Sequence, residues 1–513
     1  MNGADALLET LIAGGVDVCF ANPGTSEMQL VTAIGASDRM RPVLCLFEGV
    51  ATGAADGYAR MADRPALTLL HVGCGFANGL ANLHNARRAG SPVVNVVGDH
   101  ASYHQRYDAP LTSDLPALAA WASDWTHVAT TPDDLAAAGA AALQAACSGN
   151  GRIATLIAPA DHAWNPAATA APPQPPPAPA PVDEATIDAA VARLHSGRRS
   201  VLFLGGRALR EDNLQRLGRI AAATGARLVC QVFPARLARG AGRVAVERLP
   251  YFAEQAAETL AGTEQLLLVG AAAPVSFFAY PGSDSWLAPA GCEIVTLARG
   301  EDDLDGALAA LAAAVGDAEP ALTALALPPG PPDGPLDGLA LGQMLARHLP
   351  ADAIVVDDGT TNGLGAYLMT EGARPHDWLA LTGGAIGQGL PAALGAAIAC
   401  PQRKVVDLQA DGSAMYTIQG LWSLARERAD VLVILFNNRS YAILNIELDR
   451  VGAAAPNART RSLLDLSRPD LDFTALARAM GVAASRARTV AEFDAQLAAA
   501  FARPGPRLIE AML

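Results

Sequence analysis

The 513-residue sequence lacks the features that mark exported and membrane-embedded proteins. No stretch approaches the roughly 20 consecutive apolar residues of a membrane helix. The first residues, MNGADALLETLIAGGVDV, carry acids and glycines where a signal peptide has a basic segment followed by an apolar one. We therefore expect neither export nor membrane association, and a cytoplasmic location.

Paired cysteines and an excess of positive charge are also missing. The seven cysteines lie far apart, are odd in number and form no CxxC, which is typical of reduced thiols rather than of a disulfide framework or a zinc site. A net charge of -14 argues against general affinity for nucleic acid. The negative charge does not exclude a phosphate-bearing cofactor bound at one site. Small molecules are the expected partners.

Length and composition indicate a globular protein of several domains. The chain is 51% hydrophobic and 17% charged, and it is too long for one hydrophobic core. Two Pro-rich segments, residues 165–183 and 325–338, have the composition of extended linkers. They divide the chain into three predicted domains, residues 1–164, 184–324 and 339–513.

Short apolar runs alternate with Ala- and Leu-rich stretches through all three parts. Runs such as SVLFLGG, DAIVVDDG and ADVLVILFNN have the length and composition of buried strands, and the segments between them suit helices. This alternation predicts an α/β fold with three doubly wound, parallel-sheet domains. In such sheets ligand-binding residues gather at the carboxyl ends of the strands.

One stretch, QADGSAMYTIQGLWSLARERADVLVILFNN, places polar residues at two such ends. Asp411 follows one predicted strand and Asn438 follows the next, so a single β-α-β unit would bring them to the same edge. A carboxylate and an amide oxygen suit Mg²⁺, which commonly takes its other ligands from phosphates and water. The alternative is structural, because Asp-Gly is a common turn and Asn-Asn a common helix cap.

The stretch resembles the thiamine diphosphate motif, which runs from Gly-Asp-Gly to Asn-Asn, with Ala410 in place of the first glycine. The resemblance implies that Asp411, the side chain of Asn438 and the main-chain carbonyl of Ser440 hold Mg²⁺. It also places three further residues at the cofactor: Gly412, Ser413 and Tyr441. The methyl group of Ala410 is harmless if its φ is negative and costly if the position needs a positive φ.

The segment VLCLFEGVATGAADGYA resembles the pyrimidine-binding domain of the decarboxylase branch of thiamine diphosphate enzymes. Glu48 occupies the position of that family's glutamate. A carboxylate that hydrogen-bonds the pyrimidine helps a ring nitrogen to remove the C2 proton of the thiazolium. The ordinary alternative for Glu48 is an acid at a helix start.

Two other segments match the cofactor-binding regions of the same family. In LTGGAIGQGLPAALGAAIA, Gly384 would supply a carbonyl to the cofactor's 4′-amino group, and Ile386 would wedge the cofactor into its bent shape. In VVDDGTTNG, Thr360 and Thr361 stand where the family contacts the diphosphate, although two threonines after a strand can also simply begin a helix.

Within the branch, FANPGTSE and LHVGCGFANGLANLHNA resemble benzoylformate decarboxylase and the acetolactate-synthase-like proteins. Thr25 then corresponds to a serine that contacts the substrate carboxylate, and His71 to a histidine that handles protons. Glu447 lies where relatives place substrate-pocket residues. It could replace a missing acid or belong to a solvated helix face.

The sequence departs from both types of decarboxylase. Phe277 or Phe278 stands where benzoylformate decarboxylase brings a second histidine, and an apolar ring cannot move protons. The adjacent histidine pair of pyruvate decarboxylases is also missing, since His100 and His104 are single. Gly205-Gly206 lacks the GxGxxG arrangement and no flavin loop is found, so we expect neither FAD nor NAD.

Together these features predict a thiamine diphosphate- and Mg²⁺-dependent enzyme acting on a 2-oxo acid. Acetolactate synthase-like carboligation is preferred over simple decarboxylation of the benzoylformate decarboxylase type, because the proton-relay histidines are incomplete. A non-catalytic thiamine diphosphate-binding protein is the alternative of another class, and retention of Glu48 argues against it. The resemblance further implies a homodimer or homotetramer whose active sites lie between subunits.

Overall fold

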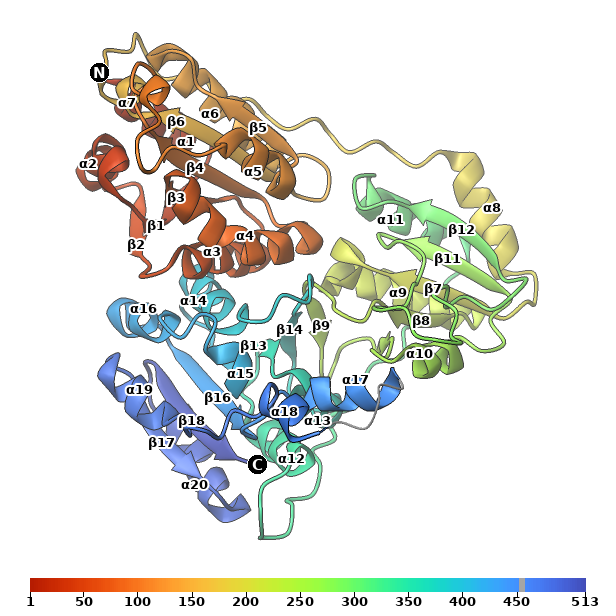
Figure 1. The fold of residues 1–513 in the computed structure, drawn as a ribbon. Coiled ribbons are helices and arrows are strands. Elements are labelled where there is room, and N and C mark those ends of the chain that lie inside the picture. The colour runs from red at the N-terminus through yellow and green to blue at the C-terminus, as the bar shows by residue number, and fades with distance from the viewer. Residues whose placement is uncertain (452–456) are drawn as a thin grey trace.

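The computed structural model describes residues 1–451 and 457–513, and it contains three β-sheets with helices packed around them (Figure 1). Within these residues, none of the helices combines the length and the apolar character that a membrane crossing requires.

The first sheet is entirely parallel and has the strand order β2-β1-β3-β4-β6-β5. Its strands are β1 (Val18–Asn22), β2 (Arg41–Leu44), β3 (Ala66–His71), β4 (Val93–Asp99), β5 (Trp125–Val128) and β6 (Ile153–Pro159). The accompanying helices are α1 (Gly3–Ala13), η1 (Thr25–Glu27), α2 (Met28–Ala36), α3 (Glu48–Ala62), α4 (Val72–Ala89), η2 (Gln105–Tyr107), α5 (Leu115–Ala122), α6 (Pro132–Ala146) and α7 (Ala160–Trp164). Phe20 faces one hydrophobic core and its neighbour Cys19 the other, so both faces of the sheet are covered.

The second sheet is smaller and also parallel, with the order β10-β8-β7-β11-β12. Its strands are β7 (Ser200–Leu204), β8 (Arg227–Cys230), β10 (Glu247–Arg248), β11 (Gln265–Val269) and β12 (Glu293–Ala298). Its helices are α8 (Glu184–Leu194), η3 (Gly206–Leu209), α9 (Glu211–Thr224), α10 (Ala253–Thr259) and α11 (Leu304–Ala314).

The third sheet has the order β17-β18-β16-β15-β13-β14-β9 and is parallel except for β9, which runs antiparallel to β14. Its strands are β9 (Leu237–Arg239), β13 (Ala353–Asp358), β14 (His376–Ala380), β15 (Val405–Ala410), β16 (Val431–Asn437), β17 (Ala483–Ala487) and β18 (Arg507–Met512). Its helices are α12 (Gly338–His348), α13 (Thr360–Met369), α14 (Gly389–Ala399), α15 (Asp411–Ala414), α16 (Gly420–Glu427), α17 (Ala442–Arg450), α18 (Ala458–Ser462), α19 (Phe473–Ala479) and α20 (Val490–Phe501).

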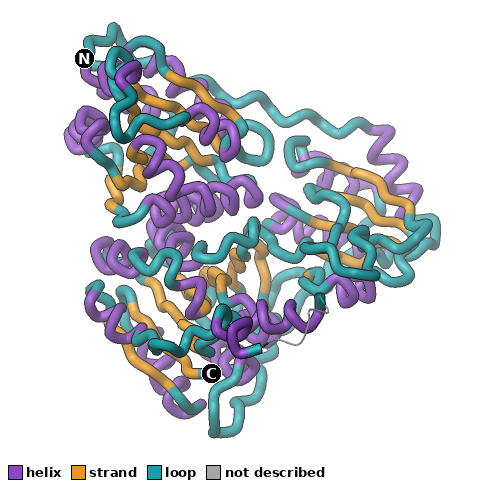
Figure 2. Tube along the Cα trace, viewed as in Figure 1, coloured by secondary structure: helices purple, strands orange, loops and turns teal. Residues whose placement is uncertain are grey.

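The two Pro-rich segments contain no strand and no helix apart from Gly338, the first residue of α12 (Gly338–His348). Residues 165–183 run as an extended, largely exposed path from the first unit to α8, and residues 325–337 form a loop before α12 (Figures 1 and 2). The domain limits drawn from these segments stay predictions, and β9 shows that the chain between them contributes to two sheets.

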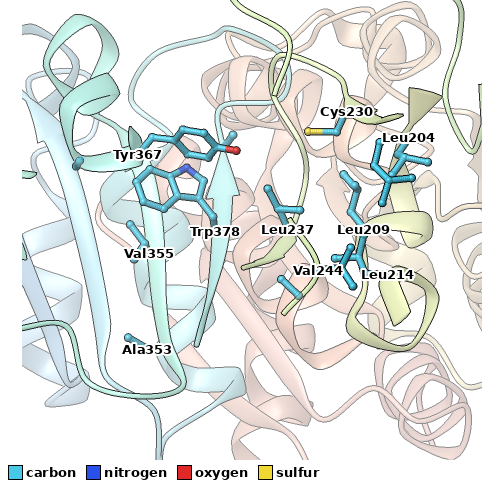
Figure 3. Close-up of a cluster of buried hydrophobic side chains, with 14 of the residues drawn as sticks. Leu204, Leu209, Leu214, Cys230, Leu237, Val244, Ala353, Val355, Tyr367 and Trp378 are labelled. Carbon is cyan, nitrogen blue, oxygen red and sulfur yellow. The ribbon is translucent and has the colours of Figure 1, made fainter. Parts of the chain in front are cut away.

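Hydrophobic cores continue from one unit into the next. Leu237 on β9 lies between Trp378 of the third sheet and Leu209 of the second unit, within one cluster of buried side chains (Figure 3). Helices α3 and α14 join the first and third units at close range, since a Cβ at Gly395 would lie 1.9 Å from the Ala54 carbonyl oxygen. The predicted α/β class with three parallel sheets is confirmed.

Candidate active site

The carboxyl ends of β15 and β16 lie side by side, because Ala410 pairs with Phe436 in the parallel register. Asp411 begins α15 directly after β15, and Asn438 follows β16. The Asp411 carboxylate accepts the N–H groups of Gly412 at 2.7 Å and of Arg439 at 2.6 Å. The chain therefore brings the acid and the Asn438 turn into direct contact, as the β-α-β spacing predicted.

The oxygen atoms around Asp411 suit a hard cation. Asn438 Oδ1 accepts the N–H of Ser440 at 2.9 Å, which orders the turn carrying the amide and the Ser440 carbonyl. Burial raises the pKa of Asp411, and the N–H groups of Gly412 and Arg439 oppose that rise. Among the described residues, no three His, Cys, Asp or Glu side chains form a group that could hold a metal. A cation here would need amide, carbonyl or phosphate ligands beside the one carboxylate.

Ala410 has φ -78° and ψ 151°, an extended conformation open to any residue. The alanine therefore requires no strain at a position where the family motif has glycine.

Strained backbone does occur at three positions at or next to predicted site residues. Val72, Thr360 and Arg439 have φ of 42°, 50° and 56°. Positive φ is uncommon for residues other than glycine, is rarest for β-branched residues such as Val72 and Thr360, and costs on the order of 1–3 kcal/mol. Val72 follows His71, Thr360 is itself a predicted diphosphate contact, and Arg439 separates Asn438 from Ser440. Backbone strain of this kind clusters at binding and catalytic sites.

Residues 382–388, termed here the glycine loop, lie between β14 and α14. Gly384 has φ 74°, and the ring of Phe277 lies against it, 2.6 Å from where a Cβ would be. Within residues 1–451 and 457–513 no hydrogen bond reaches the Gly384 carbonyl oxygen. Ile386, two residues on, is half-buried. A free carbonyl and an apolar side chain thus occupy the two predicted cofactor positions.

Helix α4 holds the glycine loop from one side. Asn85 Nδ2 donates to the Ala385 carbonyl at 2.8 Å, and the Ala385 N–H donates back to Asn85 Oδ1 at 3.2 Å. Thr382 Oγ1 donates to the Asn85 carbonyl at 2.7 Å. These paired contacts fix the backbone on either side of Gly384.

Glu48 is the first residue of α3 and is 6% exposed. Its Oε2 accepts a hydrogen bond from Asn78 Nδ2 at 3.0 Å, and a Cβ at Gly75 would lie 2.7 Å from its Oε1. The glycine at position 75 therefore makes room for the carboxylate. Asn78 is a functional candidate that the sequence did not single out.

His71 ends β3 and has a carboxylate partner. Its Nδ1 lies 2.9 Å from Glu27 Oε2 and 3.2 Å from Ser26 Oγ, and the ring packs against Gly24. Glu27 is completely buried, whereas the predicted neighbour Thr25 is exposed and its side chain forms no hydrogen bond among the described residues. Sequence reasoning missed Glu27, because nothing in NPGTSE distinguishes a buried acid from an exposed one.

Aromatic side chains of the second unit border the glycine loop. Phe277 lies in a cluster with Phe233, Tyr251 and Phe278, at ring-centroid distances of 5.7, 5.2 and 4.8 Å. Glu447 on α17 accepts a hydrogen bond from Tyr280 at 3.0 Å. The predicted substrate residues Phe277 and Glu447 thus reach the same aromatic segment, Phe277 over Gly384 and Glu447 through Tyr280.

Both ends of the chain match known family models. Residues 1–119 match the N-terminal TPP binding domain of thiamine pyrophosphate enzymes, and residues 357–511 match their C-terminal TPP binding domain. A Mycobacterium tuberculosis protein named "Putative acetolactate synthase large subunit IlvX" is 54% identical, over 100% of this chain and 99% of its own length. The chain belongs to the thiamine pyrophosphate enzymes.

Some other relatives carry the names of decarboxylases. Benzoylformate decarboxylase of Pseudomonas aeruginosa is 31% identical over 98% of this chain and 97% of its own length. The solved structure of a Rhodococcus jostii thiamine diphosphate-dependent 4-hydroxybenzoylformate decarboxylase has a TM-score of 0.88 and 25% identity, over 100% of this chain and 99% of that chain. Thiamine pyrophosphate is another name for thiamine diphosphate, so the predicted family and enzyme class are confirmed.

The chain's own residues fit that cofactor. Asp411, Asn438 and the Ser440 carbonyl provide only oxygen ligands, which suit a cation bound to a diphosphate. The Gly384 carbonyl has no donor of its own within the described chain, so it is available to an amino group. The structure brings these groups to one edge of the third sheet and holds Glu48 in the first unit.

Proposed function

We propose that this enzyme catalyses the thiamine diphosphate- and Mg²⁺-dependent decarboxylation of a 2-oxo acid, followed by carbon-carbon bond formation with a second carbonyl compound. The observation that carries the proposal is the Asp411–Asn438 turn, which supplies the ligands for a magnesium diphosphate beside the free Gly384 carbonyl. The bound cofactor supplies the electron-accepting thiazolium on which decarboxylation depends.

The protein's part is orientation and proton control. Glu48 would hydrogen-bond the pyrimidine ring and retain a proton there, while Ile386 and the Gly384 carbonyl fix the ring's position. A carboxylate at His71 Nδ1 favours an N–H at that atom, so Nε2 is left to take or give a proton. Thr360 and Thr361 would contact the diphosphate at the start of α13.

Carboligation is favoured by the ring of Phe277. This side chain lies over Gly384, at the substrate side of the proposed site, and it cannot deliver a proton to the product. Release of an aldehyde, which requires that proton, is therefore less assisted than attack on a second carbonyl group. The name of the Mycobacterium tuberculosis relative supports the same choice.

Simple decarboxylation is the second candidate. The His71–Glu27 pair could protonate the product without help from the second unit, and the Pseudomonas relative is a benzoylformate decarboxylase. Glu447 beside Tyr280 would then bind or orient the substrate.

We also propose a homodimer or homotetramer in which each active site takes Glu48 from one subunit and Asp411 from another. The geometry of α4 supports this arrangement. Glu48 lies against Gly75 and Asn78, while the glycine loop is bound to Asn85, seven to ten residues or about 10–15 Å further along the helix. All seven cysteines are free, which supports a cytoplasmic location.

The test is product identification with the purified protein, thiamine diphosphate and Mg²⁺. A panel of 2-oxo acids is supplied with and without aldehyde or 2-oxo acid acceptors, and products are identified by NMR and chiral chromatography. An acyloin or a 2-hydroxy-3-oxo acid is the expected product, and free aldehyde alone would favour the second candidate. Cofactor binding without turnover of any 2-oxo acid would contradict both.

A further inference from the structure

Buried polar side chains lie behind the glycine loop, at the ends of two central strands. Asp358 is the last residue of β13, and Asp407 and Gln409 lie on β15. Asp358 and Gln409 are direct neighbours in the register, and all three side chains are fully or almost fully buried. Strands covered on both faces are ordinarily apolar, so these residues require a reason.

Asp358 accepts hydrogen bonds from the end of the glycine loop and from the first residue of α14. Its Oδ2 accepts the N–H of Gly387 at 2.9 Å, the N–H of Gly389 at 3.1 Å and Gln409 Nε2 at 3.1 Å. Gln409 Oε1 accepts the N–H of Leu390 at 3.1 Å. Two side chains thus anchor four consecutive residues, 387–390, through three of their N–H groups.

The same residues also reach the metal-binding motif. Ser413 contacts the Gln409 side chain, and its Oγ lies 3.1 Å from the carbonyl oxygens of Asp358 and Ala410. On its other side, Asp358 is followed by Gly359 and the strained Thr360. Asp358 therefore contacts or adjoins all three cofactor-binding segments of the third unit.

We infer that Asp358, supported by Gln409, is a positioning residue that fixes the glycine loop against the metal-binding motif and so presents the Gly384 carbonyl and Ile386 to the cofactor. The inference rests on the proposed function, because the cofactor is what the loop would hold. Asn85 secures the loop from α4, and Asp358 secures it from the sheet.

The backbone N–H groups beside Asp358 require a hydrogen-bond acceptor. Without the carboxylate, the N–H groups of Gly387 and Gly389 would be buried without hydrogen-bond partners, which destabilises this arrangement of the loop. No larger residue can replace Gly389, since its Cβ would lie 2.3 Å from Gln409 Oε1. Burial raises the pKa of Asp358 to about 6, and the three donors oppose that rise.

Asp407 provides a matched comparison. It is as deeply buried as Asp358 and lies 2.6 Å from the same Gly389 Cβ position, yet neither of its oxygens has a hydrogen-bond partner within the described residues. Burial raises the pKa of Asp407 well above its usual value. Because the Asp407 carboxyl accepts no hydrogen bond from the glycine loop, removing it should change the core without freeing that loop.

The experiment compares Asp358→Ala, Asp358→Asn and Asp407→Asn. Calorimetry measures thiamine diphosphate affinity in saturating Mg²⁺, and hydrogen exchange of residues 382–391 is followed in the cofactor-free protein. Asp358→Ala should weaken cofactor binding about tenfold or more and speed exchange in the loop, because two buried N–H groups lose their acceptor. Asp358→Asn keeps an oxygen and should recover most of the affinity. Asp407→Asn should bind normally, and the KM for the 2-oxo acid at saturating cofactor should be unchanged in all three.

Normal cofactor affinity in Asp358→Ala would overturn the positioning role, and so would an equal loss in Asp407→Asn. If Asp358→Ala fails to fold, Gln409→Met replaces it, with a smaller loss expected because only the Leu390 anchor and one support of Asp358 are removed. A wild-type protein that bound no thiamine diphosphate would overturn the proposed function itself. If the wild-type protein bound thiamine diphosphate and Asp358→Ala bound it equally tightly, only the positioning role would be overturned.

Discussion

Three side chains assigned to the active site each lie against a glycine. The ring of His71 packs on Gly24, the carboxylate of Glu48 on Gly75 and the ring of Tyr441 on Gly412. In each case a Cβ would lie 2.4–2.7 Å from the nearest atom of the neighbouring side chain, closer than a Cβ atom can approach another heavy atom. These glycines are needed for packing around reactive groups rather than for turns.

Glu48→Gln tests the acid assigned to the pyrimidine ring. Glutamine keeps the size of the side chain and can still accept from Asn78, so the protein should fold and bind thiamine diphosphate. Loss of the carboxylate should slow exchange of the cofactor's C2 proton by roughly 10²–10⁴-fold, the usual contribution of a positioned acid or base. The exchange is measured by NMR in deuterated buffer.

Glu447→Gln is the matched control for this experiment. It changes a carboxylate on α17 that is bonded to Tyr280 rather than to Asn78, and C2 exchange should remain normal. Normal exchange in Glu48→Gln would remove Glu48 from the proposed role.

At the scale of helices and strands, the regular elements could be predicted from local patterns. The β-α-β unit from Val405 to Asn437 follows from apolar runs that end in polar residues, and it sets Asp411 beside Asn438. The strand β9 could not be predicted, since three residues pair with β14 only through contacts distant in sequence. Glu27 and Asp358 were missed for a related reason, because burial of a single acid is decided by tertiary packing.

Strand β14 contains a buried histidine whose charge would oppose folding. His376 Nδ1 donates to the Arg374 carbonyl at 2.8 Å, while Nε2 is buried without a partner among the described residues. Burial lowers the pKa of His376 to about 3, with Arg239 adding to the effect. The folded protein thus binds fewer protons than the unfolded chain between the usual pKa of about 6.5 and pH 3.

The stability associated with His376 should therefore be complete above pH 6.5 and decline as the pH falls toward 3. At pH 5 the loss amounts to about 2 kcal/mol, from 1.36 kcal/mol for each pKa unit. His376→Gln removes the titration, so its melting temperature should fall less than that of the wild type between pH 7.5 and pH 5. The exposed His195→Gln serves as control and should behave as the wild type. Equal falls in all three proteins would contradict the assignment.

At the scale of the whole molecule, Glu48 and the glycine loop contact different turns of α4 within one chain. Glu48 contacts Gly75 and Asn78, whereas the glycine loop is bound to Asn85, about 10–15 Å further along α4. The close packing of α3 on α14 leaves that separation fixed, because their backbones meet at Gly57 and Gly395. A second copy of the chain would bring a Glu48 to each Asp411 if the copies associate about a twofold axis.

Co-expression of two inactive variants tests this arrangement directly. Chains carrying Glu48→Gln and chains carrying Asp411→Ala should each be inactive alone, the second because the metal and diphosphate are no longer held. If each site takes Glu48 from one chain and Asp411 from the other, a mixed dimer has one intact site, and random mixing should restore about a quarter of wild-type activity. A site contained within one chain would give no activity in the mixture. The converse control mixes wild-type chains with chains that carry both Glu48→Gln and Asp411→Ala. If each site is formed by two chains, about a quarter of wild-type activity should remain, and if each site lies within one chain, about half should remain.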